Sequence, residues 1–402
     1  MTESVGIYFH IPWCRSICTY CDFDRQAHAF ELIPEYVEAL VTDIGRQPAL
    51  EVHSIYFGGG TPSLLTARQV RKVLAACRSR FRLLVDAEVT LEANPGDLDA
   101  ARVKAFVVAG VNRISLGVQS LDDGMLRLLG RRHDARGAEH AAREARAGGI
   151  QNLSLDLMYG LPGQSPAHWR ETLRRALVLR PEHISAYLLT IDDRVPLGRQ
   201  VSRGRLSLPD DEPVSEMYRD LQGLMAKHDY HQYEISNWAR SGFTSRHNLT
   251  YWRDEPYLGF GAGAASSFGG RRFKNTTDPA AYIAAVRSGV PELAEDELTA
   301  RLTAVQDHLA LGLRLREGLS LDRFERRFGR RFCDLAGAEL NSLAKAGVLE
   351  LDADRLRIAD NYLLVSNEVI LRLHEAVGRN WWQAEDDDLL GAQVRASTPD
   401  EL

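Results

Sequence analysis

The chain has 402 residues, of which 45% are hydrophobic and 26% charged, and its formal net charge is −6. This length exceeds the size at which a single hydrophobic core keeps growing, so we expect a large domain with at least one smaller unit. The negative balance argues against nucleic acid as a partner, and no apolar run approaches the ~18 residues that span a bilayer.

The first half of the chain alternates short strand-like segments with amphipathic ones. Runs rich in β-branched and aromatic residues predict six strands, at residues 5–12, 54–60, 88–95, 113–120, 152–160 and 183–191. Between them, apolar residues recur at helical spacing, as in residues 34–46, 66–81, 98–110 and 165–179. Such units, at roughly 30 residues each, predict a parallel sheet. Because there are six rather than eight, we expect an α/β fold with a partial (β/α)6 barrel over residues 1–195.

The pattern changes after residue 195. Residues 196–298 are dense in aromatic, glycine and polar residues, so we expect irregular strands and loops there. From 299 to 380, three helical segments precede a short hairpin around Asp352 to Asp354, which is the order of a winged-helix-like domain. It lacks a basic stripe, so we interpret it as a packing domain. The acidic tail, residues 381–402, is predicted to be disordered.

Three of the five cysteines lie close together, with the spacing C-x3-C-x2-C, on the loop after the first predicted strand. An odd, clustered set indicates metal or redox chemistry in a reducing compartment, and with no targeting signal at the N-terminus we expect a cytoplasmic protein. A structural zinc site would need a fourth ligand, which only His10 offers nearby. An iron–sulfur cluster held by three thiolates instead leaves one iron open to a ligand. The three candidate metal ligands are Cys14, Cys18 and Cys21.

The other predicted strands end in groups suited to bind such a ligand. The second ends in the glycine-rich stretch Gly58 to Pro62, the third at Glu92 and the fourth at Gln119, while the fifth carries Asp156. In α/β barrels the carboxyl ends of the strands form the site, so these groups are expected to face the cysteines. Glycine allows close backbone approach, and carboxylates accept hydrogen bonds from amines or hydroxyls. Arg131 is a candidate partner for a carboxylate.

Together these motifs resemble the radical S-adenosylmethionine (SAM) enzymes, and within them the relatives of oxygen-independent coproporphyrinogen III oxidase. The lead-in Tyr8-x-His10-x-Pro12 and the strings "VQSLDDGMLRLLGRRH" and "LDLMYGLPGQS" extend the similarity, which covers residues 5 to 380. The resemblance implies a [4Fe-4S] cluster on the three cysteines, and SAM chelating the open iron. One electron would then cleave SAM to methionine and a 5′-deoxyadenosyl radical. The residues implied to line the SAM sites are Tyr8, Tyr20, Gly59, Gly60, Thr61, Glu92, Gln119, Arg131 and Asp156.

Two departures from the oxidase pattern resemble the HemW family of heme chaperones instead. The oxidases carry a fourth cysteine where this chain has Phe23, and they carry a substantial segment before the motif, where this chain has 13 residues before Cys14. The string "RHNLTYW" supplies an H-N-x-x-Y motif that is associated with heme binding in that family. Imidazole is a suitable axial ligand of heme iron, so the resemblance implies heme contacts from His247 and Tyr251. The alternative for His247 is a loop histidine hydrogen-bonded to backbone.

We therefore expect a heme chaperone of porphyrin metabolism, which binds heme, a [4Fe-4S] cluster and SAM and transfers heme to acceptor proteins. The alternatives are an oxygen-independent coproporphyrinogen III oxidase, which decarboxylates porphyrinogen propionates, and a structural zinc protein. SAM cleavage is compatible with the motifs, whereas oxidase activity is not expected, and no catalytic residue is assigned. A reductant for the cluster is a further expected partner. Transient membrane-protein acceptors and a homodimer are compatible with the sequence.

Overall fold

The structure is a computed structural model that describes residues 4–352 and 354–396, with side chains through residue 381. By its internal contacts the chain forms two compact units. Unit 1 comprises the chain up to residue 232 together with residues 236–250 and 255–298. Unit 2 comprises residues 233–235 and 251–254 and the chain from residue 299 onward.

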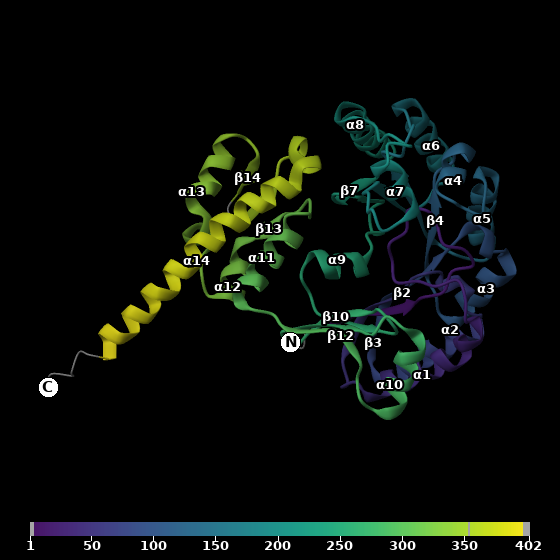
Figure 1. Cartoon of the computed structure of the whole chain (residues 1–402), viewed down its shortest axis with the longest axis horizontal. Coiled ribbons are helices and arrows are strands. Elements are labelled where there is room, and N and C mark those ends of the chain that lie inside the picture. Colours follow the sequence, from purple (N-terminus) through teal and green to yellow (C-terminus); the bar gives the residue numbers. More distant parts are fainter. Residues whose placement is uncertain (1–3, 353, 397–402) are drawn as a thin grey trace. The chain divides into compact units, whose positions relative to one another are not determined.

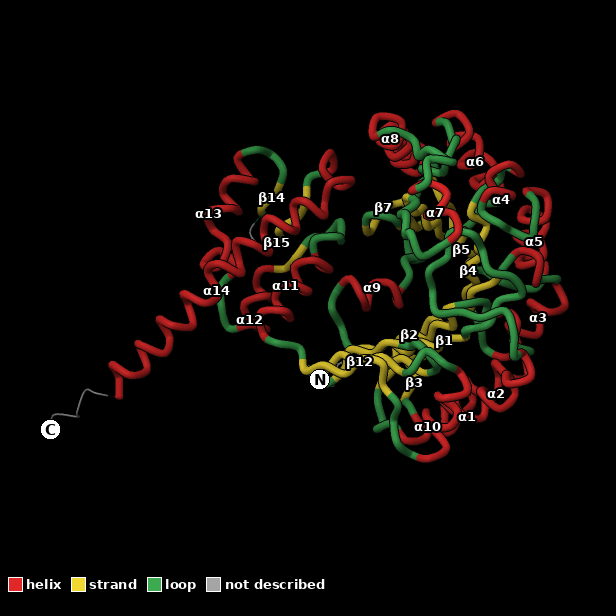
Figure 2. Tube along the Cα trace, viewed as in Figure 1, coloured by secondary structure: helices red, strands yellow, loops and turns green. Residues whose placement is uncertain are grey.

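The centre of unit 1 is the predicted partial (β/α)6 barrel, a parallel sheet in the order β1-β2-β3-β4-β5-β6 (Figures 1 and 2). Each strand is connected to the next through one or two helices. The strands are β1 (Val5–Ile11), β2 (Glu51–Gly59), β3 (Arg82–Ala93), β4 (Arg113–Gln119), β5 (Asn152–Tyr159) and β6 (His183–Leu188). The helices are α1 (Ile33–Arg46), α2 (Ala67–Arg80), α3 (Ala100–Ala109), α4 (Asp123–Leu128), α5 (Ala135–Ala147) and α6 (Pro166–Val178).

Local capping explains where these helices begin. Thr66 and Gln69 form a capping box at the start of α2, in which the Thr66 hydroxyl accepts a hydrogen bond from the Gln69 amide at 3.2 Å. At the start of α6, Ser165 caps the helix and Pro166 occupies its first turn, where a missing amide hydrogen costs nothing. These signals lie within a few residues of one another, and for this reason the sequence predicts the helix boundaries closely.

Most residues of the barrel strands are buried, as is usual for parallel strands covered by helices. In β1, all residues except Tyr8 are buried. Phe9 packs between neighbouring strands, with its ring centroid 4.9 Å from that of Phe57 and 5.3 Å from that of Phe260. This apolar layer fixes the outer wall, so that the polar groups of the strands are left for the interior and for the carboxyl edge.

Residues 196–298, for which we expected an irregular α/β extension of strands and loops, add strands to both edges of the barrel sheet. The complete sheet has the order β12-β11-β10-β9-β1-β2-β3-β4-β5-β6-β8-β7. Its added strands are too short and polar to show a clear period in the sequence, and pairing with the barrel stabilises them. They are β7 (His231–Glu234), β8 (Asn237–Ala239), β9 (Tyr257–Phe260), β10 (Ala265–Phe268), β11 (Arg271–Asn275) and β12 (Leu293–Leu298). The helices of the segment are α7 (Pro196–Ser202), α8 (Asp211–Lys227), α9 (Arg246–Trp252) and α10 (Pro279–Ser288).

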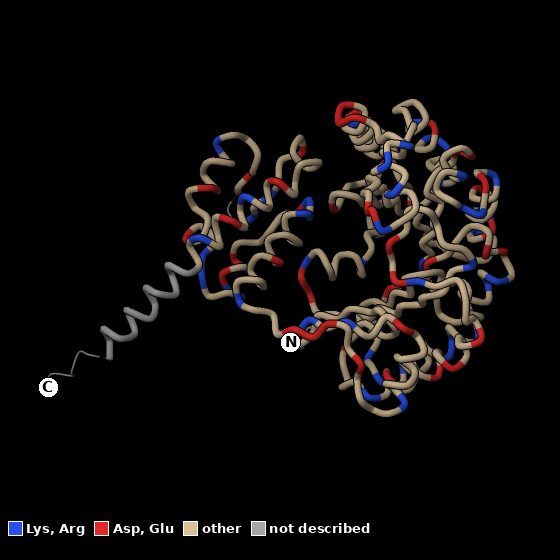
Figure 3. The backbone as a smooth tube through the Cα atoms, in the orientation of Figure 1, with Lys and Arg blue, Asp and Glu red and all other residues tan. Residues whose placement is uncertain are grey.

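The outermost strands β11 and β12 are held together by opposite charges. Basic residues of β11 face acidic residues of β12, and Figure 3 shows blue and red segments side by side there. Arg271 and Asp296 form an ion pair of 2.6 Å. Opposite charges on facing strands favour pairing, so this polar edge needs no hydrophobic face of its own.

Unit 2 contains the expected sequence of three helices followed by a hairpin. The helices are α11 (Arg301–Gly312), α12 (Leu321–Phe328) and α13 (Phe332–Lys345), and the hairpin is formed by β14 (Leu349–Leu351) and β15 (Arg355–Ile358), which pairs with β13 (Leu319–Ser320). Helix α14 (Ser366–Ala396) follows and includes residues 381–396 of the tail for which we expected disorder. Residues 397–402 of that predicted tail lie outside the described residues.

In the part of the chain that the structure describes, no helix combines the length and the apolar character required to cross a membrane.

Candidate cofactor-binding site

The three clustered cysteines lie on one loop between β1 and α1. Backbone hydrogen bonds hold its two ends together: the Cys14 amide donates to the Gln26 carbonyl oxygen at 2.9 Å, and the Gln26 amide donates to that of Pro12 at 2.7 Å. The Thr19 hydroxyl in the middle of the loop donates to the Leu128 carbonyl oxygen at 2.9 Å. All three cysteines are half-buried free thiols that line one cavity. The fold thus presents three thiols to a single space.

The glycine-rich end of β2 packs directly against this loop. Gly59 has a positive φ of 105°, and a Cβ there would lie 2.6 Å from the His10 ring. A Cβ on Gly60 would lie 2.8 Å from the Trp13 carbonyl oxygen, and the Gly60 amide donates to the Ile11 carbonyl oxygen at 2.9 Å. These glycines therefore allow two strand ends to approach each other, in addition to leaving room for a ligand.

A chain of polar contacts connects the cysteine loop to the neighbouring strand ends. The Thr61 hydroxyl lies 3.4 Å from Cys14 Sγ and accepts a hydrogen bond of 2.9 Å from the Asn94 amide group. Arg131 hydrogen-bonds to the Asn94 side-chain oxygen and places its Nη1 3.5 Å from Cys18 Sγ. Two of the thiols consequently lie beside a hydroxyl and a guanidinium, which are suited to stabilise negative charge on sulfur.

The far end of the cavity is lined by two buried carboxyl groups. Tyr56 donates to Glu92 Oε1 at 2.7 Å, and the Ser115 hydroxyl lies 3.0 and 3.1 Å from the two oxygens of Asp156. Burial raises the pKa of Glu92 to about 7, with the Tyr56 hydrogen bond acting in the opposite direction. Burial also raises the pKa of Asp156, against the lowering effect of Arg113. Both carboxyl groups are thus prepared to accept a cationic or hydroxyl-bearing ligand.

Gln119 ends β4 in an unusual backbone conformation. Its φ is 65°, in the left-handed region that glutamine rarely adopts, and the pairing of β4 with β5 shifts register between Gly117 and Gln119. Such strain persists where the surrounding structure enforces it and is found often at functional sites. Here it accompanies a side chain that lines the cavity.

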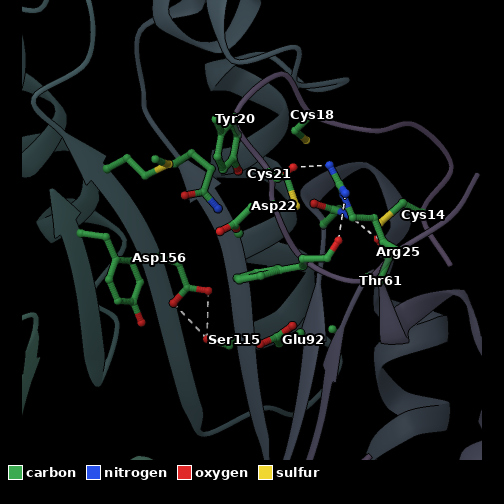
Figure 4. A pocket seen from close by; sticks show the side chains of 18 of the residues that line it. Cys14, Cys18, Tyr20, Cys21, Asp22, Arg25, Thr61, Glu92, Ser115 and Asp156 are labelled. Atoms are coloured by element: carbon green, nitrogen blue, oxygen red, sulfur yellow. Dashed lines mark hydrogen bonds between the residues drawn. The ribbon is translucent and has the colours of Figure 1, made fainter. Parts of the chain in front are cut away.

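The cavity that these groups share has a volume of about 540 Å³, which lies in the range typical of small-molecule sites. Figure 4 shows the cysteines at one end and Glu92, Ser115 and Asp156 at the other. Most of the residues predicted for the site come together here. Those that line the cavity are Cys14, Cys18, Cys21, Tyr20, Gly59, Gly60, Thr61, Glu92, Gln119, Arg131 and Asp156.

Three predicted contact residues do not line the cavity. Tyr8 lies behind it: His10 donates from Nε2 to the Asp24 carbonyl oxygen at 2.7 Å, so its Nδ1 accepts from the Tyr8 hydroxyl at 3.0 Å. Tyr251 is half-buried at the C-terminal end of helix α9. His247 is only 1% exposed.

His247 belongs to a group of polar side chains that we call the α9 cluster, in which Ser54, Glu88, His247 and Thr250 are buried and His53 is half-buried. The His247 Nδ1 lies 3.0 Å from the Ser54 hydroxyl, and His53 Nε2 lies 2.7 Å from that of Thr250. Glu88 accepts hydrogen bonds from the backbone amides at the start of α9, including that of His247 at 3.3 Å. Burial lowers the pKa of His247 to about 3, so the imidazole is neutral.

The H-N-x-x-Y motif lies on helix α9, and the His247 ring stacks on that of Tyr56 with centroids 5.0 Å apart. Ligation of heme iron by His247 would require α9 to leave this position, and it stays a prediction. The following residue, Asn248, does line the cavity.

The zinc alternative loses its fourth ligand, because both ring nitrogens of His10 already have partners. Among the side chains that the structure describes, no three from His, Cys, Asp or Glu lie close enough to hold a single metal ion. Three thiols around a larger cavity suit a polynuclear cluster better than one ion. The two other cysteines lie in helices, Cys77 in α2 and Cys333 in α13, so the described cysteines offer no fourth thiol.

Sequence reasoning missed several cavity residues that the register of β4 would have indicated. Arg113, Ser115, Gly117 and Gln119 alternate along the strand and all line the cavity. In a strand, residues two apart point to the same face. The prediction that Gln119 faces the site therefore implies the same for the residues two, four and six positions before it. Asn94 and Asn248 carry no such pattern, because Asn94 lies just after the end of β3 and Asn248 lies within the short helix α9.

The comparisons with known proteins agree with this geometry. The family model described as the Radical SAM superfamily matches residues 8–176, and that of the HemN C-terminal domain matches residues 301–361. A protein named heme chaperone HemW from Bacillus subtilis is 37% identical over 368 residues, covering 90% of this chain and 97% of the relative. A mitochondrial protein from Bos taurus, named radical S-adenosyl methionine domain-containing protein 1, is 36% identical and covers 95% and 90%.

Among solved structures, coproporphyrinogen III oxidase from Escherichia coli, described as a radical SAM enzyme, has a similar fold. The TM-score is 0.80 over 93% of this chain and 90% of the oxidase, at 22% sequence identity. This match confirms the expected fold class, a barrel of the radical SAM type with a helical C-terminal region.

Proposed function

Because this chain belongs to the HemW family of radical SAM heme chaperones, we propose that it binds heme, a [4Fe-4S] cluster and SAM and passes the heme to acceptor proteins. The observation that carries the proposal is the similarity to HemW of Bacillus subtilis, which extends over nearly the whole of both chains. The cavity supports it, since three thiols and a set of polar strand ends line one space.

We assign the cluster to Cys14, Cys18 and Cys21, and the open iron position to SAM. When bound, such a cluster supplies one electron and an open coordination position to its ligand. The Arg131 guanidinium beside Cys18 would then offset negative charge on the sulfur ligands, and the Thr61 hydroxyl would donate a hydrogen bond to Cys14.

The chain's own polar groups would orient SAM within the cavity. Glu92 and Asp156 lie at the end away from the cysteines, where a carboxylate can accept hydrogen bonds from ribose hydroxyls or from an amine. The pKa of Glu92 is raised to about 7, and a cationic amine bound nearby would favour its ionised form. Gln119 and Tyr20 complete the lining between the two ends.

Oxygen-independent coproporphyrinogen III oxidase remains the second candidate. The match to the HemN C-terminal domain and the common fold favour it, but the 22% identity to the solved oxidase establishes the fold alone. Against it stands Phe23, which occupies the position of a fourth cysteine in the oxidase pattern.

Several partners follow from the proposed function. Heme-accepting proteins are required by it, and a reductant would be needed if the cluster transfers electrons. Clustered free thiols fit a reducing compartment, so we propose a cytoplasmic location. Transient membrane-protein acceptors and a homodimer are further proposals that binding partners captured by crosslinking would test.

One preparation tests both candidate functions. Protein reconstituted anaerobically with iron and sulfide should bind heme, seen as a Soret band that saturates on titration, and should leave coproporphyrinogen III unconverted in the presence of SAM and a reductant. Iron and sulfide analysis of the same sample shows whether the cluster is intact, which is required before a negative result can be interpreted. Multiple-turnover formation of protoporphyrinogen IX would contradict the chaperone and establish the oxidase, and failure to bind heme with an intact cluster would also contradict the chaperone.

A further inference from the structure

Large apolar side chains are exposed where the cofactor cavity opens. Four of the fourteen exposed large apolar residues identified in the described chain line this one cavity; we call them the apolar rim, and they are Ile17 (46% exposed), Phe23 (61%), Tyr187 (43%) and Leu188 (41%). Two come from the cysteine loop and two from the end of β6. Exposed apolar residues that gather around a concave site commonly mark a binding surface, whereas isolated ones do not.

The two segments of the rim are fixed to one another beneath the surface. Tyr20, in the cysteine loop, packs against a buried apolar group that includes Leu189 and Leu197 from the chain after β6. Leu189 is 7% exposed, whereas its neighbour Leu188 is 41% exposed. Because successive residues of an extended chain point to opposite sides, the burial of Leu189 directs Leu188 towards the rim. Leu188 is itself positioned over Gly160, where an added Cβ would lie 2.5 Å from Leu188 Cδ1. The exposure of Leu188 is thus built into the packing.

Phe23 is held in a comparable way. The Arg25 guanidinium, which also lines the cavity, donates from Nη1 to the Phe23 carbonyl oxygen at 2.8 Å and from Nη2 to that of Cys21. Arg25 Nε is buried and has no hydrogen-bond partner among the described residues. That nitrogen is too buried to reach a ligand at the cavity mouth, but Arg25 itself lines the cavity, and each Nη nitrogen carries a second N–H. The charged guanidinium of a cavity-lining arginine is suited to pair with a ligand carboxylate.

We propose that the apolar rim is the heme-docking surface, with heme lying across the mouth of the cavity above SAM. This assignment rests on the proposed heme chaperone function and deepens it. Two aromatic and two aliphatic side chains suit the faces of a porphyrin, and Arg25 suits a propionate. An apolar segment of an acceptor protein would not require the guanidinium, so heme is the better occupant. Phe23, which replaces a fourth cysteine, then acquires a binding role.

Single substitutions on each rim segment test the proposal. Phe23→Ser and Leu188→Ser should each weaken heme binding about tenfold or more, because each removes a large apolar contact. Phe30→Ser is the matched control, since Phe30 is 39% exposed but does not line the cavity, and it should bind heme as the unaltered protein does. All proteins are reconstituted anaerobically and checked for iron and sulfide, because Phe23 is close to Cys21. Leu188 is remote from the cysteines in sequence.

A second measurement locates heme relative to SAM. If heme lies across the cavity mouth, heme should slow the release of radiolabelled SAM several-fold, and Leu188→Ser should lose most of the slowing at a heme concentration near the dissociation constant of the unaltered protein. Unaltered heme affinity in both rim variants, or SAM release that is independent of heme, would overturn the rim assignment while leaving the chaperone function intact. Absence of heme binding by the unaltered protein with an intact cluster would instead refute the function itself.

Discussion

Two groups of largely buried polar side chains lie within the barrel, and they differ in how fully they bond to one another. In the α9 cluster, His53, Ser54, Glu88 and His247 find partners in neighbouring side chains or in the first amides of α9. In the cofactor cavity, Glu92 accepts from Tyr56, and Asp156 accepts from Ser115 and Ser185, but both residues also line an open space. Arg25 Nε has no hydrogen-bond partner among the described residues.

This difference separates a structural role from a binding role. A buried polar group whose hydrogen bonds are complete stabilises one packing arrangement, and an added ligand would have to break those bonds. A group that retains bonding capacity beside a cavity gains from a ligand. The α9 cluster thus closes the inside of the sheet, whereas the cavity is prepared for cofactors.

The largest effect should follow a change in the cavity. Cys18→Ala removes one of three thiolates, so we expect reconstituted protein to lose most of its iron, from about four atoms per chain, together with the spectral change on adding SAM. Iron and sulfide analysis with the visible spectrum measures this. Cys333→Ala, an exposed cysteine of α13, is the control and should retain the cluster. Stoichiometric zinc without labile sulfide in the unaltered protein would show that the three cysteines do not hold an iron–sulfur cluster.

A change in the α9 cluster should affect stability instead. His247→Ala leaves a cavity and an unpartnered Ser54 hydroxyl, so we expect the free energy of unfolding to fall by about 3 kcal/mol, measured by urea titration. Iron content and the Soret band of bound heme should stay unchanged. Ser54→Ala, which removes only the hydroxyl, should cost about 1 kcal/mol. A shifted Soret band in His247→Ala would instead support the axial ligation that the motif predicts.

A smaller and pH-dependent effect should distinguish Glu92. Its pKa is raised from 4.5 to about 7, so the folded state binds the proton more tightly than the unfolded state does. The stability that this proton confers is complete below about pH 4.5 and is lost as the pH rises through 7. Between pH 5 and pH 7.5 the unaltered protein without SAM should therefore lose about 2 kcal/mol that Glu92→Gln does not lose. Parallel urea titrations at the two pH values measure the difference. If the free energy of unfolding changes equally with pH in both proteins, Glu92 is not protonated in the cavity.

The sequence by itself determined most of the barrel and one end of the site. The six strands were predicted because apolar and β-branched residues alternate locally with glycine and proline stops, and the helix starts because caps such as Thr66 and Ser165 act within one turn. The spacing of the three cysteines predicted a cluster loop for the same reason, since all its ligands lie within eight residues. Strand ends such as Glu92 and Gln119 could be placed at one edge because parallel strands bring their carboxyl ends together.

Only the tertiary structure decided which polar groups form hydrogen bonds within the protein and which can still bond to a ligand. His247 pairs with Ser54 across 193 positions of sequence, and no local pattern records such a contact. The same holds for the strands of residues 231–298, which are too short to be stable alone and form by pairing with distant edges of the sheet. It also holds for Leu188 and Leu189, adjacent and chemically identical, of which packing against Tyr20 buries one and leaves the other at the mouth of the cavity. Burial is a property of neighbours brought from far along the chain, so it is decided by folding and not by composition.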